Sequence, residues 1–223
     1  MTATLTPTRQ TTNSTVTGPL VAAIESAWAS IQDKHPEAPH VVLTLGNGTG
    51  KPGHLTFGHF HDQKWAVGTD RLPELFIGGE GLRRGAVPLL GTLLHEAAHG
   101  VASMRGIQDT SRQGRYHNTK FRDIAVELGI TVDKDPRIGW SITTVPDLTA
   151  ASYTTEVDEL DQALTAYRLA DAPNGKPKTN NGIVAECGCD PARKIRLSRS
   201  TYDLGPIDCG ICEQPFTAAT DEG

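Results

Sequence analysis

The first hydrophobic pattern along the chain has the spacing of an α-helix. Leu20, Ile24 and Ile31 lie four and seven positions apart, so they form one apolar stripe on a helix. Pro19 suits the first turn of a helix, and His35-Pro36 disfavours its continuation. The pattern therefore predicts a helix between Pro19 and His35.

Short β-type runs follow this helix. They are rich in β-branched, leucine and aromatic residues and are separated by Gly, Asn and Asp, which are typical of turns. The predicted strands are 41–45, 54–60, 64–68 and 74–77, with a turn at 61–63. We expect these strands to form a small twisted sheet that packs on the neighbouring helices.

Helical spacing returns at Gly85 and gives the strongest apolar pattern in the chain. Residues 89, 90, 93, 94, 97, 98 and 101 form a wide apolar face, which predicts a helix that ends near Gly106. The other predicted elements are a helix built on Phe121, Ile124, Ala125 and Leu128 and stopped by Gly129, a strand at 138–145, and an amphipathic helix that carries Val157, Leu160, Leu164 and Tyr167.

Composition divides the 223 residues into five segments. We expect a disordered N-terminal tail, because the first seventeen residues are rich in Thr and poor in apolar side chains. The segments are a tail at 1–17, an α+β domain at 18–146, an acidic helix and linker at 147–182, a small cysteine module at 183–216, and a tail at 217–223.

The overall charge and hydropathy exclude two classes of protein. The net charge of −5 excludes a protein held on nucleic acid by bulk positive charge. No apolar run approaches the ~20 residues needed to span a bilayer, and the N-terminus offers no secretion signal. We therefore expect a cytoplasmic protein that is not inserted in a membrane.

The motif His95-Glu96-Ala97-Ala98-His99 lies within the strongest predicted helix. Two histidines four positions apart share one face of a helix, so both imidazoles can bind a single Zn²⁺. The glutamate between them can act as a general base toward a water molecule at that metal. This spacing predicts a catalytic zinc site with His95 and His99 as ligands and Glu96 as the base.

A catalytic zinc site needs a third protein ligand and an open fourth position. The metzincin spacing H-E-x-x-H-x-x-G-x-x-H fails, because positions 102 and 105 are Ala and Arg. His117, just before the second predicted helix, is the favoured third ligand, and Glu127 on that helix is the alternative. Tyr116 and Arg115 are candidate donors to the oxyanion that forms during hydrolysis.

Four cysteines form two close pairs near the C-terminus. Cys187-Gly188-Cys189 and Cys209-Gly210-Ile211-Cys212 have the pattern of two knuckles around a tetrahedral structural Zn²⁺. Four reduced thiols or two disulfides are the alternatives. Lys194 and Arg196 alternate with apolar residues on a predicted strand and, with Arg199, are candidate nucleic-acid contacts; a solvated face is the competing interpretation.

The joint order of these motifs resembles the SprT-like (Spartan-related) zinc metallopeptidase family. The matching residues are His95, Glu96 and His99, then His117-Asn118-Thr119-Lys120-Phe121, then the four cysteines. The resemblance covers about residues 18–216. It implies a zincin-like catalytic domain with His95, His99 and His117 on zinc and Glu96 as the base, followed by a zinc ribbon.

The predicted function is therefore zinc-dependent endopeptidase activity on protein substrates. The resemblance adds DNA-associated proteins as a substrate class and DNA as a candidate partner. The alternative from another class is a non-catalytic zinc-ribbon module that binds DNA or protein and keeps a vestigial H-E-x-x-H site. A peptidase that cleaves repressors and takes its third ligand from a carboxylate is the alternative among enzymes. Measuring bound zinc after mutation of His117 and of Glu127 distinguishes these two enzyme hypotheses, because each predicts a different third ligand.

Overall fold

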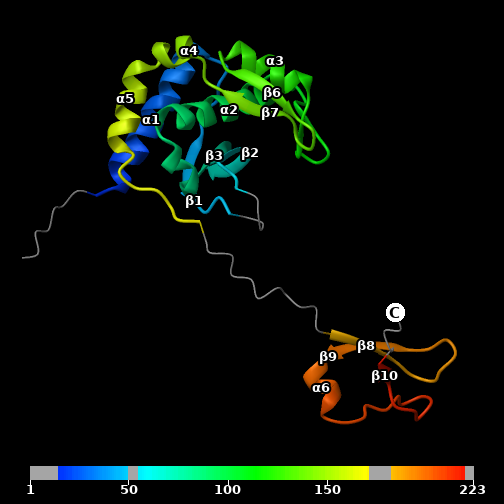
Figure 1. Cartoon of the computed structure of the whole chain (residues 1–223). Helices are drawn as coiled ribbons and strands as arrows, with labels where there is room; N and C mark the ends of the chain where they lie inside the picture. Colours follow the sequence, from blue (N-terminus) through cyan, green and yellow to red (C-terminus); the bar gives the residue numbers. More distant parts are fainter. Residues whose placement is uncertain (1–14, 50–54, 171–181, 219–223) are drawn as a thin grey trace, which may run out of the picture. The chain divides into compact units, whose positions relative to one another are not determined.

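The computed structural model describes residues 15–49, 55–170 and 182–218. The chain divides into two compact units, Met1–Asp171 and Ala172–Gly223 (Figure 1). Among the described residues, both units combine α-helices with small β-sheets, so the predicted α+β class is confirmed. The predicted tail up to residue 14, His54, the linker at 171–181 and residues 219–223 lie outside the described residues.

The first unit contains five α-helices, one 3-10 helix and seven strands among its described residues. They are α1 Thr17–Lys34, β1 Val42–Gly46, β2 Gly58–Val67, β3 Asp70–Gly78, η1 Gly79–Arg84, α2 Ala86–Met104, β4 Thr110–Ser111, β5 Tyr116–His117, α3 Thr119–Glu127, β6 Thr131–Asp135, β7 Gly139–Thr144, α4 Asp147–Ser152 and α5 Thr154–Ala163.

Helix α2 is the centre of the hydrophobic core. Its leucines at 89, 90, 93 and 94 and its alanines at 97 and 98 are almost completely buried, because other elements cover it on several sides. Figure 1 shows α1 and α5 beside α2, and the buried Ile24 and Leu160 belong to the same core. A helix that is apolar over most of its circumference needs such cover. The helix that carries the H-E-x-x-H motif is therefore packed on several sides by the core.

The first sheet has the strand order β1-β3-β2, with β1 parallel and β2 antiparallel to β3. The prediction of two strands separated by a turn at 61–63 was wrong, because β2 runs continuously from Gly58 to Val67. The polar residues that indicated a turn form an irregularity within β2, where the pairing register shifts between His61 and Trp65 and Gln63 has φ 51°. β2 lies at the edge of the sheet, beside α2.

The second sheet has the order β4-β5-β7-β6 and packs against α2 and α3. β7 agrees with the predicted strand at 138–145, whereas β6 was not predicted, because its alternating side chains are mostly exposed and charged. Helix α5 packs on α1, so the first unit continues past the boundary expected at residue 146 and reaches Asp171. Tyr167 lies beyond the end of α5 and is exposed.

The second unit is a three-stranded sheet with the order β10-β8-β9. Its described elements are β8 Gly182–Glu186, β9 Lys194–Ser198, α6 Arg199–Asp203 and β10 Thr217–Ala218. Ala185 and Phe216 pack with buried Cys187 and Cys209 in a separate, small core. Across both units, none of the described helices combines the length and apolarity that a membrane crossing needs.

Candidate metal centres and the cleft

The three histidines predicted as ligands meet at one point in the first unit. The Nε2 atom of His117 lies 3.3 Å from Nε2 of His95 and 3.2 Å from Nε2 of His99. One ligand nitrogen from each of the three rings lies within 4.8 Å of the others. Three nitrogen atoms converging in this way can hold a metal ion.

Two local features bring His117 to this point. β5 pairs with β7, and the backbone N–H of His117 donates to the carbonyl oxygen of Ile138 over 2.9 Å. Gly139 has φ 79°, and a Cβ atom there would lie 2.1 Å from the carbonyl oxygen of His117, so only glycine fits. Asn118 then caps α3, because its side chain accepts from the backbone N–H groups of Lys120 and Phe121.

The rings of His99 and His117 are each oriented by a second contact. Nδ1 of His99 lies 2.5 Å from a carboxylate oxygen of Asp109, and Nδ1 of His117 lies 3.2 Å from the carbonyl oxygen of Ile138. Such partners fix Nδ1 as the donor and leave Nε2 free to bind a metal. The ring of Phe121 lies 4.6 Å, between centroids, from each of the three imidazoles. Asp109 was not predicted as a site residue, because only the fold brings it to His99.

Glu96 is buried beside these rings, at 4% exposure. Burial raises the pKa of Glu96 to about 7, although His99 and the backbone N–H of Phe60 act in the opposite direction. A carboxylate that binds protons near neutral pH suits general acid–base chemistry. Burial also lowers the pKa values of His95 and His117, with a further contribution from His99. These two imidazoles are therefore neutral, as metal ligands must be.

Gly58, at the start of β2, allows the edge strand to approach Glu96. A Cβ atom at Gly58 would lie 2.7 Å from Cγ2 of Thr92 and 3.0 Å from a carboxylate oxygen of Glu96. The first distance is shorter than the contacts that real Cβ atoms make, and the second is tighter than most of them. The absence of a side chain at Gly58 therefore keeps the glutamate accessible between β2 and α2.

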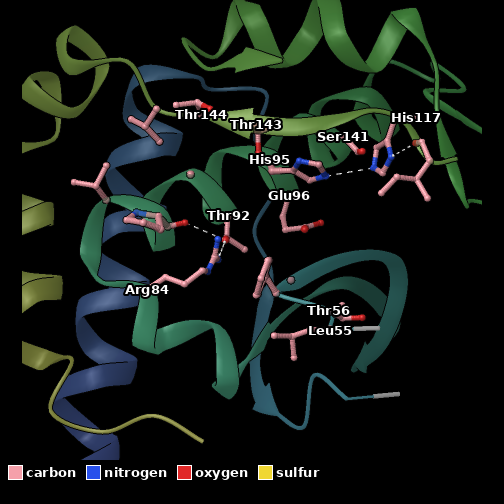
Figure 2. Close-up of a pocket in the computed structure, with 17 residues that line it drawn as sticks. Leu55, Thr56, Arg84, Thr92, His95, Glu96, His117, Ser141, Thr143 and Thr144 are labelled. Atoms are coloured by element: carbon pink, nitrogen blue, oxygen red, sulfur yellow. Dashed lines mark hydrogen bonds between the residues drawn. The ribbon is translucent and has the colours of Figure 1, made fainter. Parts of the chain in front are cut away.

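Two cavities open from the histidine cluster. One has a volume of about 700 Å³ and the other about 1010 Å³, and both are lined by His95, Glu96 and His117. Figure 2 shows the first cavity, with Thr92 and Arg84 on the side of Glu96 away from His117. The shared lining means that space extends in two directions from the same reactive residues.

The other predicted residues of this region have different surroundings. Glu127, the alternative ligand, binds Arg105 through two hydrogen bonds of 2.8 and 2.7 Å and is not in the histidine group. Arg115 lines the larger cavity, whereas the ring of Tyr116 lies against Arg112. Of the two candidate oxyanion donors, Arg115 is therefore the one that lines a cavity beside the histidine group.

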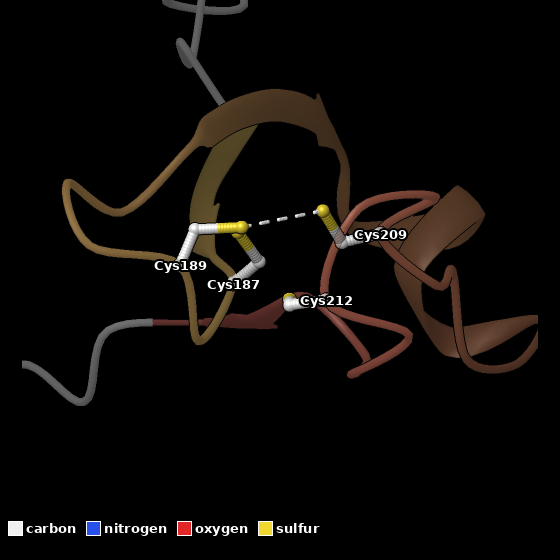
Figure 3. A group of neighbouring side chains, drawn as sticks. All are labelled: Cys187, Cys189, Cys209 and Cys212. Atoms are coloured by element: carbon white, nitrogen blue, oxygen red, sulfur yellow. Dashed lines mark hydrogen bonds between the residues drawn. The ribbon is translucent and has the colours of Figure 1, made fainter.

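The four cysteines form the second metal-binding group. Their sulfur atoms lie within 4.8 Å of one another, and all four cysteines are free thiols (Figure 3). The backbone N–H groups of Cys212 and Ile211 lower the pKa of Cys209 to about 6, and Arg193 donates to its sulfur over 3.4 Å. The four sulfur atoms are not bonded in pairs, so the alternative of two disulfides does not fit the structure. A group of four sulfur donors suits a closed, structural metal site.

The predicted basic face is partly neutralised. Lys194 and Arg196 are exposed on β9, and Arg199 follows on α6, but Lys194 pairs with Glu186 over 2.7 Å. Residues 182–218 contain four Lys or Arg (193, 194, 196, 199) and five Asp or Glu (186, 190, 203, 208, 213). This balance favours a solvated face over a surface for phosphates.

Comparison with family models, with curated proteins and with solved structures gave no match. The geometry of the two groups is therefore the basis for a functional assignment.

Proposed function

We propose that this chain is a zinc-dependent endopeptidase of the SprT-like type, with a zincin-like first unit and a zinc ribbon as the second. One observation carries the proposal, which is the convergence of three imidazoles beside a buried glutamate at the meeting point of two cavities. A purely structural metal site has no use for such a glutamate. This argues against the alternative of a vestigial site in a non-catalytic binding module.

The residues of the first unit divide the reaction between them. His95, His99 and His117 would hold the zinc ion, with Asp109 fixing the ring of His99. Bound zinc would polarise the scissile carbonyl and lower the pKa of a coordinated water toward ~7. Glu96 would accept a proton from the attacking water and transfer it to the leaving amine. Arg115 is the proposed donor to the developing oxyanion.

The edge strand offers a means of holding a polypeptide substrate. One side of β2 is not paired by any strand among the described residues. Its first residue, Gly58, lines both cavities, and residues 59–62 line the larger one. An extended peptide can add to such an edge through backbone hydrogen bonds. The substrate would therefore be an unfolded or extended protein segment, and DNA-associated proteins are the class that the resemblance suggests.

In the second unit, Cys187, Cys189, Cys209 and Cys212 would hold a structural zinc ion. The small core of this unit gives it little hydrophobic stabilisation of its own, so bound metal would contribute folding free energy.

The Glu96→Gln variant tests the catalytic assignment. We expect it to bind zinc like the wild type but to cleave an unfolded protein at least ~100-fold more slowly, because general-base catalysis contributes about that much. Metal analysis and cleavage of a fluorescent casein measure the two properties. Glu127→Gln, an exposed carboxylate on α3, is the matched control and should remain active. Full activity in Glu96→Gln with its zinc retained would contradict the proposal.

A further inference from the structure

Arg84 places a positive charge in the smaller cavity that the proposed reaction does not use. It is the only Lys or Arg among the described residues that line this cavity. Most of the other lining residues are apolar or carry hydroxyl groups, and the exceptions are the histidines and Glu96. Arg84 is therefore a single cationic side chain in a wall that is otherwise mainly apolar or hydroxyl-bearing.

Three contacts orient the guanidinium of Arg84. Its Nη2 donates to Oγ1 of Thr92 over 2.8 Å, and its Nε donates to the carbonyl oxygen of Gly81 over 3.2 Å. The guanidinium carbon lies 3.6 Å from the centroid of the Phe57 ring. A guanidinium held by packing and hydrogen bonds loses less freedom when it binds a further partner.

None of these contacts neutralises the charge. No carboxylate forms an ion pair with Arg84 in the part of the chain that the structure describes, and the nearby Glu80 is paired with Arg168 over 2.5 Å. Burial by the surrounding chain lowers the pKa of Arg84, which an acidic partner would counteract. The residue nevertheless remains exposed to solvent, so a ligand in the cavity can reach it.

Arg84 is the last residue of η1, and its position beside α2 determines what it can contact. Thr92 lies one helical turn, about 5.4 Å, before Glu96, and Figure 2 shows Arg84 beside Thr92. One residue of an extended peptide spans about 3.3–3.6 Å. A side chain one or two residues from the scissile bond would therefore reach the guanidinium.

We propose that Arg84 is a specificity-determining residue that binds a carboxylate of the peptide substrate. Arginine matches a carboxylate with two parallel hydrogen bonds, and Phe57 and Thr92 hold the fork in place. The carboxylate can belong to an Asp or Glu side chain near the scissile bond or to a free C-terminus. The inference rests on the proposed peptidase function but is tested separately from it.

The test measures peptide binding to full-length, zinc-loaded Glu96→Gln protein by fluorescence anisotropy. The probes are peptide pairs that differ only by Glu or Gln at one of the positions around a central bond, and pairs with a free or an amidated C-terminus. We expect one pair to show about tenfold tighter binding of the carboxylate form. A preference within a Glu/Gln pair would show that Arg84 binds a side-chain carboxylate, and a preference within a free/amidated pair would show that it binds a C-terminal carboxylate.

Variants at position 84 then assign the preference. Adding Arg84→Gln should abolish the discrimination, and adding Arg84→Glu should shift it toward the same peptides with Lys. Arg83→Gln is the matched control, since Arg83 is the adjacent exposed arginine and does not line either cavity. Equal binding of every pair, or discrimination that survives Arg84→Gln, would overturn the proposal.

Cleavage of the same peptides by the wild type separates the two proposals. Cleavage that follows the binding preference supports both, and cleavage without any carboxylate preference overturns the role of Arg84 alone. A preference in binding that depends on Arg84, together with no cleavage by the zinc-loaded wild type, supports the binding role and rejects the peptidase function.

Discussion

At the scale of single residues, the candidate site depends on groups that surround the H-E-x-x-H motif. His95 and His99 are proposed metal ligands and Glu96 is the proposed base, whereas Asp109 and Gly58 affect the positions of these side chains. The first does so by a hydrogen bond and the second by having no side chain. Each of these two contributions can be removed by one substitution that leaves the motif intact.

Asp109→Asn should weaken zinc binding by about 10- to 100-fold, because the carboxylate that orients the His99 ring and increases its basicity is lost. Competition with a chromogenic chelator measures the affinity. Asp123→Asn is the control, since Asp123 is exposed on α3 and pairs only with the neighbouring Arg122 among the described ion pairs. Unchanged affinity in Asp109→Asn would show that the hydrogen bond does not contribute to metal binding.

Gly58→Ala should reduce cleavage at least ~10-fold while zinc is retained. The added methyl group would meet Thr92 and Glu96, and Thr92 is a β-branched side chain whose hydroxyl is held by the carbonyl of Pro88. Such overpacking costs about 1–3 kcal/mol, so the melting temperature should also fall. Gly18→Ala, whose new Cβ meets only an ordinary contact of 3.5 Å, is the control for thermal unfolding and activity. A fully active Gly58→Ala would show that β2 and Glu96 can separate without loss.

At the scale of elements, the sequence was informative where a long apolar pattern existed. α1 and α2 were predicted because their buried stripes extend over several turns, and His117 was placed correctly before α3 because Phe121 marked the buried side of that helix. β6 is short and largely exposed, and the irregular β2 contains polar residues, so neither has a clear period. Asp109, Gly58 and Arg84 reach the site only through tertiary packing, which spacing cannot indicate.

The junction of β1 and η1 offers a test of electrostatics between elements. Glu80 is buried, and burial by itself would raise the pKa of its carboxyl group. Hydrogen bonds from the backbone N–H of Gly48 and the guanidinium of Arg168 have the opposite effect and outweigh burial. The pKa of Glu80 therefore lies below its ordinary value of 4.5. A lowered pKa in the folded state stabilises the fold above the unfolded pKa, and this contribution is lost as the pH falls through the folded value.

Glu80→Gln should therefore lower the free energy of unfolding by about 1–3 kcal/mol at pH 7, where the charged hydrogen bonds are present. The difference from the wild type should shrink below about pH 4.5 and vanish at lower pH, because Glu80 is then protonated in both states. Thermal unfolding from pH 7 to pH 3 measures this, with both proteins stripped of metal so that release of metal at low pH does not contribute. A difference that stays constant with pH would assign the effect of the substitution to packing instead of charge.

At the scale of the whole molecule, the chain carries two metal-binding groups in two compact units with separate hydrophobic cores. Two of the three histidines lie on α2, the central helix of the larger core, and that core is built from side chains outside the histidine group. The cysteine group is itself half of the smaller core, because Cys187 and Cys209 are two of its four buried members. Loss of metal should therefore affect the two units differently.

The double variant Cys187→Ser/Cys209→Ser should bind one zinc equivalent instead of two. Removing one ligand from each knuckle leaves two thiols, too few for a tetrahedral site, so residues 182–218 should unfold. Hydrogen exchange should become fast in this segment and stay slow in α2, because the two cores share no residue. For the same reason, the variant with its remaining zinc should cleave a short peptide within about twofold of the wild-type rate. Cys187→Ser/Cys209→Ser combined with His117→Ala should bind no zinc. Loss of both zinc equivalents from the cysteine variant alone would instead show that the metal centre of the first unit depends on the second.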